Sequence, residues 1–259
     1  MAGSENLNKR GSNSMSNSPA QKKTRHLFNS GLLIDSTPIT VFVGHTESRF
    51  SVHECLLTTD SEFFKSALSK EWKENLERIV KLPEAKPEAF HLYAKWLYSG
   101  KVYSGKVYSS KNNDTYEKNN IEYNNEWSRL VDCYKLGDFL LSLDFKDATI
   151  DAISEVSISR DILRVDFASY IYPISTKESL HRTLCRDLTI HLWDRKFANI
   201  RDPSLPREFL EDLLVDIGPQ LSNGLKDQGL HVFAHCLNTC NYHEHTRFDK
   251  PCYKTKFSY

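Results

Sequence analysis

Three short apolar segments constrain the fold of the N-terminal half most strongly. Residues 39–43 read ITVFV, residues 49–53 read RFSVH, and a polar turn separates them. Apolar side chains that alternate over five residues on both sides of such a turn predict two strands joined in a hairpin. A third segment, IVKL at residues 79–82, predicts another short strand. The three predicted strands form at most a small sheet, so other parts of the chain must pack against its apolar side chains.

Helical patterns lie between and after these strands. Thr59 and Glu62 have the spacing of a capping box, and two phenylalanines follow on one face of the predicted helix. Pro87 opens a second helix, whose apolar residues recur at helical spacing until Gly100, which is placed to end it. Strands interleaved with helices predict an α+β fold for this part of the chain.

A repeated pentad follows that helix. Residues 98–110 read YSGKVYSGKVYSS, which places Gly100, Gly105 and Lys106 at the spacing of a phosphate-binding loop. Val107 stands where such a loop needs a hydroxyl, and the segment follows a helix instead of a strand, so the pattern does not predict a nucleotide site. Residues 101–125 show no helical period and are rich in polar residues, which predicts an exposed loop insertion.

The second half of the chain has the pattern of helices. Apolar residues recur at helical spacing over residues 127–156, 180–192 and 209–217. Ser175 and Glu178 form a second capping-box pattern, which predicts that a helix begins there. An all-helical C-terminal region is therefore expected.

Composition sets the expected domain limits. Residues 1–26 carry almost no large apolar side chain, so they cannot offset the entropy of ordering, and we expect a disordered tail. A helical extension over residues 156–228 and a tail containing Cys and His over residues 229–259 complete the expected organisation.

Charge, hydropathy and motifs exclude several classes of function. The chain has 34 basic and 34 acidic residues, so no net charge attracts it to nucleic acid or to an anionic membrane. No apolar run reaches the roughly 20 residues that span a bilayer, and residues 1–26 lack the apolar core of a signal peptide. We expect a protein of the cytoplasm or nucleus that is not secreted. Hydrolase, kinase and dinucleotide motifs are absent from the sequence, which predicts a protein that is not an enzyme.

The N-terminal pattern resembles the BTB/POZ domain. The likeness rests on residues of the strands, turns and helix faces: Gly44, Phe50, Val52, His53, Leu56, Phe63, Phe64, Phe90, Tyr98 and Gly100. The run LVDCYKLGDFLLSLDFKDATIDAI at residues 130–153 resembles the closing helical pair of the family. The resemblance implies an α+β fold with a small three-stranded sheet packed with helices. It also implies one BTB/POZ domain over residues 27–155, with the loop insertion inside it. The whole chain is most similar to fungal members that have a C-terminal helical extension and no zinc fingers or kelch repeats.

The resemblance implies a protein-binding function without catalysis. BTB domains bind proteins, commonly as homodimers, and some are substrate adaptors that dock a cullin scaffold of a ubiquitin ligase through a hydrophobic-x-Glu triplet. Trp72, Lys73 and Glu74 stand where that triplet would be. An aromatic side chain in a pocket beside a charge-assisted contact is typical of an interface hot spot. A second interpretation is that Trp72 only covers the edge of the core.

The resemblance also leaves other binding functions open. Corepressor binding in the family uses a basic residue after the motif histidine, but Glu54 follows His53 here. The usual homodimer exchanges an N-terminal helix, for which only His26–Leu33 is available. A homo-oligomerisation scaffold and a transcription-associated protein without its own DNA-binding domain remain alternatives to the cullin adaptor.

The tail contains a cluster of candidate metal ligands. Cys240, His243, His245 and Cys252 lie close together in the sequence, with Cys236 just before them. Thiolate and imidazole groups suit tetrahedral zinc, although the spacing matches no standard zinc motif. Structural zinc and reduced thiols beside surface histidines both remain open, and no other motif calls for a cofactor.

Overall fold

The computed structural model describes residues 34–69, 77–105, 116–160, 164, 166–192, 204–223 and 238–256. Several sequence-based expectations fall on other residues and lie outside this description. They are the disordered tail at 1–26, the exchanged helix at 26–33, Trp72, Glu74 and Cys236.

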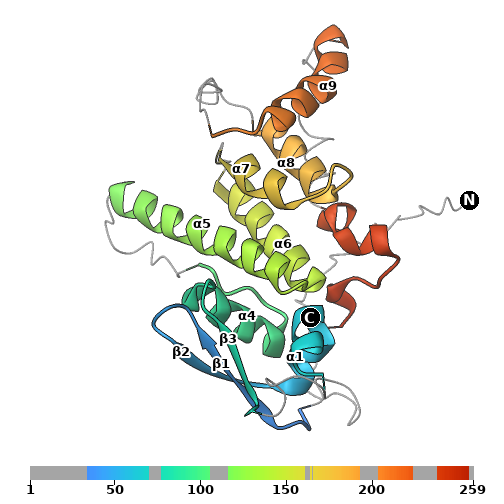
Figure 1. The fold of residues 1–259 in the computed structure, drawn as a ribbon. Coiled ribbons are helices and arrows are strands. Elements are labelled where there is room, and N and C mark those ends of the chain that lie inside the picture. The colour runs from blue at the N-terminus through green and yellow to red at the C-terminus, as the bar shows by residue number, and fades with distance from the viewer. Residues whose placement is uncertain are drawn as a thin grey trace, which may run out of the picture. The chain divides into compact units, whose positions relative to one another are not determined.

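A three-stranded sheet forms the base of the N-terminal part (Figure 1). Strands β1 (Pro38–Val43) and β2 (Ser48–His53) pair antiparallel, and β3 (Ile79–Leu82) lies parallel to β1 on its other side. The strand order is thus β2-β1-β3. Alternate side chains of the central strand, from Ile39 to Val43, are fully buried, as period-two patterning requires. The three predicted strands are confirmed.

Helices α1 (Glu54–Asp60), α2 (Glu62–Ala67) and α4 (Pro87–Ser99) pack with this sheet. The capping box predicted at Thr59 is wrong, because α1 continues through that residue. Ser61 caps α2 instead, since its hydroxyl accepts a hydrogen bond from the Phe64 backbone N–H at 3.2 Å.

Gly100 ends α4 as predicted. Its φ of 68° is left-handed, and its backbone N–H donates to the Trp96 carbonyl at 2.7 Å.

The long helices α5 (Tyr116–Phe139) and α6 (Leu143–Arg160) run side by side beyond α4 (Figure 1). The predicted loop at 101–125 is therefore wrong over its last ten residues, which are helical. Tyr123 is buried in the core of the helical region, so tertiary contacts stabilise a stretch whose own sequence is mostly polar. The domain limit expected at residue 155 falls inside α6.

Four further elements form the helical C-terminal region. They are α7 (Phe167–Ile171), the 3-10 turn η1 (Tyr172–Ile174), α8 (Leu180–His191) and α9 (Arg207–Asn223). No helix in the described parts of the chain is both long enough and apolar enough to cross a membrane.

The start of α8 differs from the prediction. Ser179, and not Ser175, caps this helix, because the Ser179 hydroxyl accepts a hydrogen bond from the His181 backbone N–H at 3.2 Å. Leu214 of α9, which the helical pattern places among the apolar positions, is also exposed.

Two apolar cores share α6. Phe145 and Ala148 belong to the core built on the sheet, whereas Ile150 and Ile153 belong to the core of the helical region. Successive turns of α6 therefore belong to both cores.

Residues 238–256, here called the C-terminal strap, pack against the same two cores. The strap contains the 3-10 turns η3 (Thr239–Tyr242), η4 (Glu244–Phe248) and η5 (Tyr253–Thr255). Tyr242 is buried in the helical core and Tyr253 in the sheet core. The strap is thus a packed part of the fold.

Candidate functional site

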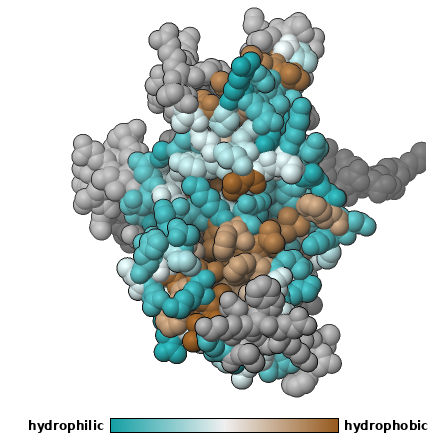
Figure 2. All heavy atoms as spheres, viewed as in Figure 1, coloured by the Kyte–Doolittle hydropathy of each residue, from teal (hydrophilic) through white to brown (hydrophobic). Residues whose placement is uncertain are grey.

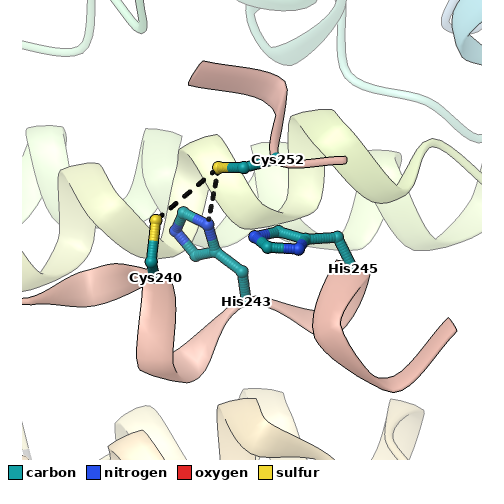
Figure 3. Close-up of side chains that lie close together, drawn as sticks. All are labelled: Cys240, His243, His245 and Cys252. Atoms are coloured by element: carbon teal, nitrogen blue, oxygen red, sulfur yellow. Dashed lines mark hydrogen bonds between the residues drawn. The ribbon is translucent and has the colours of Figure 1, made fainter. Parts of the chain in front are cut away.

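The strap brings the four candidate metal ligands together. In Figure 3 the side chains of Cys240, His243, His245 and Cys252 converge. Cys240 lies in η3, His243 between η3 and η4, His245 in η4 and Cys252 just before η5. One ligand atom from each residue can be chosen so that all four lie within 4.8 Å of one another. Both histidines are buried and both cysteines are half-buried, so the cluster is largely closed to water.

Two distances define the centre of this cluster. The Sγ atoms of Cys240 and Cys252 are 3.7 Å apart, and Cys252 Sγ lies 3.4 Å from His243 Nδ1. Burial, together with the neighbouring Cys240 thiol, raises the pKa of the Cys252 thiol to about 11. In the absence of a metal, the Cys252 thiol is therefore protonated near neutral pH.

Asp151 of α6 orients the His243 ring. The Nε2 atom of His243 lies 2.7 Å from Asp151 Oδ1, and Lys254 Nζ lies 2.8 Å from Asp151 Oδ2. Although burial raises the pKa of Asp151, the hydrogen bond and charge of His243 and the contact with Lys254 lower it to about 2. An ionised carboxylate only accepts, so His243 Nε2 donates and Nδ1 carries the lone pair that faces Cys252.

Asp147, one helical turn earlier on α6, fixes the start of η4. Its carboxylate accepts hydrogen bonds from the Glu244 backbone N–H at 2.9 Å and from His181 Nε2 at 3.0 Å. The side chain of Asp147 is fully buried, so these donors replace the water that an exposed carboxylate would bind. Asp147 and Asp151 thus hold the strap along one face of α6.

The His245 ring is placed differently from the His243 ring. Its centroid lies 5.2 Å from that of His243 at an interplanar angle of 70°. The Nε2 atom of His245 is buried and has no hydrogen-bond partner among the residues that the structure describes. A buried imidazole nitrogen without a partner is unfavourable, which marks this atom as one that lacks a ligand.

The sequence could have indicated the two aspartates. Asp147 and Asp151 are four residues apart in a helical segment, so they share a face, and that face also carries apolar core residues. Their partners lie more than 90 residues away, and no local pattern predicts that pairing.

A second candidate site is an apolar surface at the end of α5. Phe139 is 53% exposed and Leu141 is 62% exposed, and the Phe139 ring lies 5.2 Å from that of Phe63 in α2. We call these three residues the α5 apolar surface. Figure 2 shows apolar side chains gathered over this part of the molecule. Trp72 and Glu74, in the segment that follows α2, lie outside the described residues.

A hollow adjoins this surface. It has a volume of about 440 Å³, and Pro83, Ala85, Leu136 and Phe139 supply part of its lining. The ion pair between Lys86 Nζ and Asp132 Oδ2, 2.8 Å apart, lies at the same hollow. An apolar hollow beside an ion pair can accept a bulky side chain together with a polar contact.

The residues that carry the BTB resemblance lie in and around the sheet core. Val52, Leu56, Phe64 and Phe90 are buried, Phe50 and Phe63 are partly buried, and Gly44 has a φ of 75°. These residues therefore contribute to the core and to a turn of the fold.

The motif histidine and the residue after it both have partners. His53 Nδ1 lies 2.7 Å from the Tyr98 hydroxyl, at the junction between β2 and α1. Glu54 pairs with Arg78 at 2.8 Å. Neither residue is placed as a catalytic group.

Comparison with known proteins assigns the N-terminal part of the chain. Residues 25–121 match the family model of the BTB/POZ domain. No curated protein matches the chain. The match covers the three-stranded sheet and the helices α1, α2 and α4 that pack on it. The chain therefore contains a BTB/POZ domain, a domain that mediates interactions between proteins, and a helical C-terminal region follows it.

Proposed function

We propose that this protein is a non-enzymatic adaptor whose BTB domain docks a cullin scaffold of a ubiquitin ligase. The observation that carries the proposal is the α5 apolar surface. This surface includes Phe63 of α2, and the hydrophobic-x-Glu triplet at Trp72, Lys73 and Glu74 follows α2 in the sequence. Exposed apolar side chains on neighbouring elements are typical of protein interfaces.

The conformation of Leu141 supports a role for its side chain at the surface. Its φ of 52° lies in the left-handed region, where Gly, Asn and Asp are favoured over leucine. A leucine in this conformation therefore strains the backbone, and its exposed side chain makes few core contacts that would offset the strain. Partner binding gives a reason for this residue, since burial of its apolar surface in a complex is favourable.

The helical region offers a separate surface for a client. Leu214 and Val215 of α9 are 69% and 73% exposed. They lie on α9, which shares no residue with the α5 apolar surface, so a client and the cullin scaffold would contact different residues. The adaptor function requires two such surfaces.

The triplet gives the first test. Native chain, Trp72→Ala and Glu74→Ala are incubated with immobilised N-terminal region of a cullin scaffold, and the retained protein is measured. We expect each substitution to reduce recovery by about tenfold, as for an interface hot spot. Leu214→Ala is the control and retains native recovery.

Circular dichroism of each variant separates loss of binding from loss of folding. Equal recovery of native chain and both triplet variants would contradict the proposal. So would a native chain that is folded and does not bind. If either result is found, a molecular mass that rises with protein concentration in sedimentation experiments would favour the homo-oligomerisation scaffold.

A further inference from the structure

We infer that Cys240, His243, His245 and Cys252 form a structural zinc site that fixes the C-terminal strap. The four residues supply two thiols and two imidazoles, a donor set that favours zinc in tetrahedral geometry. The inference does not depend on cullin docking, because the site lies in the strap and not on the α5 apolar surface.

Two separations match the edges of a tetrahedron around one zinc ion, and all four ligand atoms lie within 4.8 Å of one another. Usual zinc–sulfur and zinc–nitrogen bonds place two sulfur ligands about 3.8 Å apart and a sulfur and a nitrogen about 3.6 Å apart. The Sγ atoms of Cys240 and Cys252 are 3.7 Å apart, and Cys252 Sγ is 3.4 Å from His243 Nδ1. These two edges have the required length before any metal is added.

The hydrogen bond to Asp151 leaves His243 Nδ1 as the ring nitrogen that can bind a metal, and without zinc this nitrogen lies at hydrogen-bond distance, 3.4 Å, from Cys252 Sγ. His243 donates from Nε2 to Asp151, so Nδ1 faces Cys252 as a lone-pair donor. A carboxylate that holds the second nitrogen of a ligand histidine is the usual support of zinc sites.

His245 supplies an independent observation. Its Nε2 is buried without a hydrogen-bond partner in the described parts of the chain, and in Figure 3 its ring is directed toward the other three side chains. Zinc would satisfy this nitrogen. With four protein ligands the ion has no open position, which is the arrangement of a structural site.

Charge balance is favourable. Zinc binding converts the Cys240 and Cys252 thiols to thiolates and releases two protons, so the two negative charges offset those of the ion. The charge of Asp151 is already paired with Lys254. The site therefore gains no net charge on binding zinc.

A disulfide between the two cysteines is the competing arrangement. An S–S bond is about 2.05 Å long, so these sulfur atoms would have to approach by more than an ångström. A disulfide would also leave His245 Nε2 without a partner. The observed spacing and the histidines favour zinc over that bond.

Zinc at this position would join both cores. Tyr242 precedes His243 and lies in the helical core, whereas Tyr253 follows Cys252 and lies in the sheet core. The ion would therefore tie the two anchored ends of the strap to each other across α6.

Elemental analysis of the full chain, purified under reducing conditions without chelator, tests the inference. We expect about one equivalent of zinc in native protein and less than about a tenth in Cys252→Ser and His245→Asn. Cys55→Ser is the control, because Cys55 is a half-buried cysteine outside the cluster, and it retains the native content.

Cobalt replacement gives a readout that does not depend on stability. Native protein loaded with Co²⁺ is expected to show the visible absorption of a tetrahedral site and a thiolate-to-metal band. Cys252→Ser, which should hold less than about a tenth of an equivalent of metal, is expected to lose that band. The inference is overturned if native protein contains less than about a tenth of an equivalent of zinc and takes up neither zinc nor cobalt. A Cys240–Cys252 disulfide found by mass spectrometry of the purified native protein would also overturn it.

Discussion

Asp60 is the most unusual carboxyl group of the domain core. It lies at the end of α1, where it accepts hydrogen bonds from Tyr93 Oη at 2.8 Å and from Ser142 Oγ at 2.5 Å. Burial raises the pKa of Asp60 to about 6, although both hydrogen bonds act to lower it. The carboxyl group therefore holds its proton in the folded state at a pH where the unfolded chain has released it.

This shift predicts a pH dependence of stability. The folded state binds more protons than the unfolded state between about pH 4 and pH 6, so the free energy of unfolding falls as pH rises through that range. A shift from 3.8 to about 6 corresponds to about 3 kcal/mol. Urea unfolding across this range should show the fall in native protein, and Asp60→Asn should lack that contribution. If the free energy of unfolding changes with pH in the same way in both proteins, the prediction is contradicted.

At the scale of secondary structure, α5 and α6 approach each other closely at Gly137. A Cβ atom at this position would lie 2.8 Å from Lys146 Cγ and 3.4 Å from a carbon of the Phe145 ring. Lys146 is also held by its ion pair with Asp138 at 2.8 Å, so its side chain cannot move freely. The glycine thus permits the packing of the two helices.

Gly137→Ala should therefore destabilise the protein by about 1–3 kcal/mol, as overpacked contacts do. Gly218→Ala is a matched control, since Gly218 lies inside α9 and a Cβ there has no neighbour within 4 Å. That change should stay within about 1 kcal/mol, because the gain in helix propensity is opposed by crowding between the new Cβ and the ring of Pro219. Urea unfolding of both variants measures the difference, and equal effects would refute the close contact.

The elements that local patterns specify were predicted well from the sequence. The three strands follow period-two alternation, and α4 begins at a proline and ends at a glycine. Ser61 was missed as a cap because the spacing of Thr59 and Glu62 indicated a helix start two residues earlier. The Ser61 hydroxyl also donates to the Leu140 carbonyl, 79 residues away, and no local pattern predicts that contact. The first turns of α5 were missed because Tyr123 depends on contacts with the helical core.

The candidate sites were predictable only in part. Composition identifies four potential metal ligands in the strap, but their support by Asp147 and Asp151 arises from tertiary structure. The exposure of Phe139 likewise could not be read from its helical spacing, which places it among core positions. Patterns identify residue types, whereas packing decides which side chains face a partner.

At the scale of the whole molecule, the strap stabilises two cores at once. Tyr253 is buried in the sheet core, and its hydroxyl contacts Asp151 on α6. Its ring lies 6.5 Å from that of Trp96 in α4. The strap therefore links α4 to the helix that both cores share.

Tyr253→Ala should lower the free energy of unfolding by about 3–5 kcal/mol, the usual cost of removing a buried aromatic ring. Phe248→Ala is the control in the same strap, because Phe248 is 58% exposed, and its effect should stay within about 0.5 kcal/mol. Chemical unfolding followed by tryptophan fluorescence measures both. If the two substitutions have the same small effect, the strap does not stabilise the fold.

The central functional claim is that the BTB domain docks a cullin scaffold through the α5 apolar surface. Isothermal titration calorimetry with the N-terminal cullin region tests it most directly, with native chain, Leu141→Asn and Leu214→Asn. Asparagine tolerates the left-handed backbone at Leu141, so Leu141→Asn should fold at least as stably as native protein while binding about tenfold more weakly. Leu214→Asn should bind like the native chain. Absence of binding by folded native protein, or equal affinity of all three proteins, would contradict the claim.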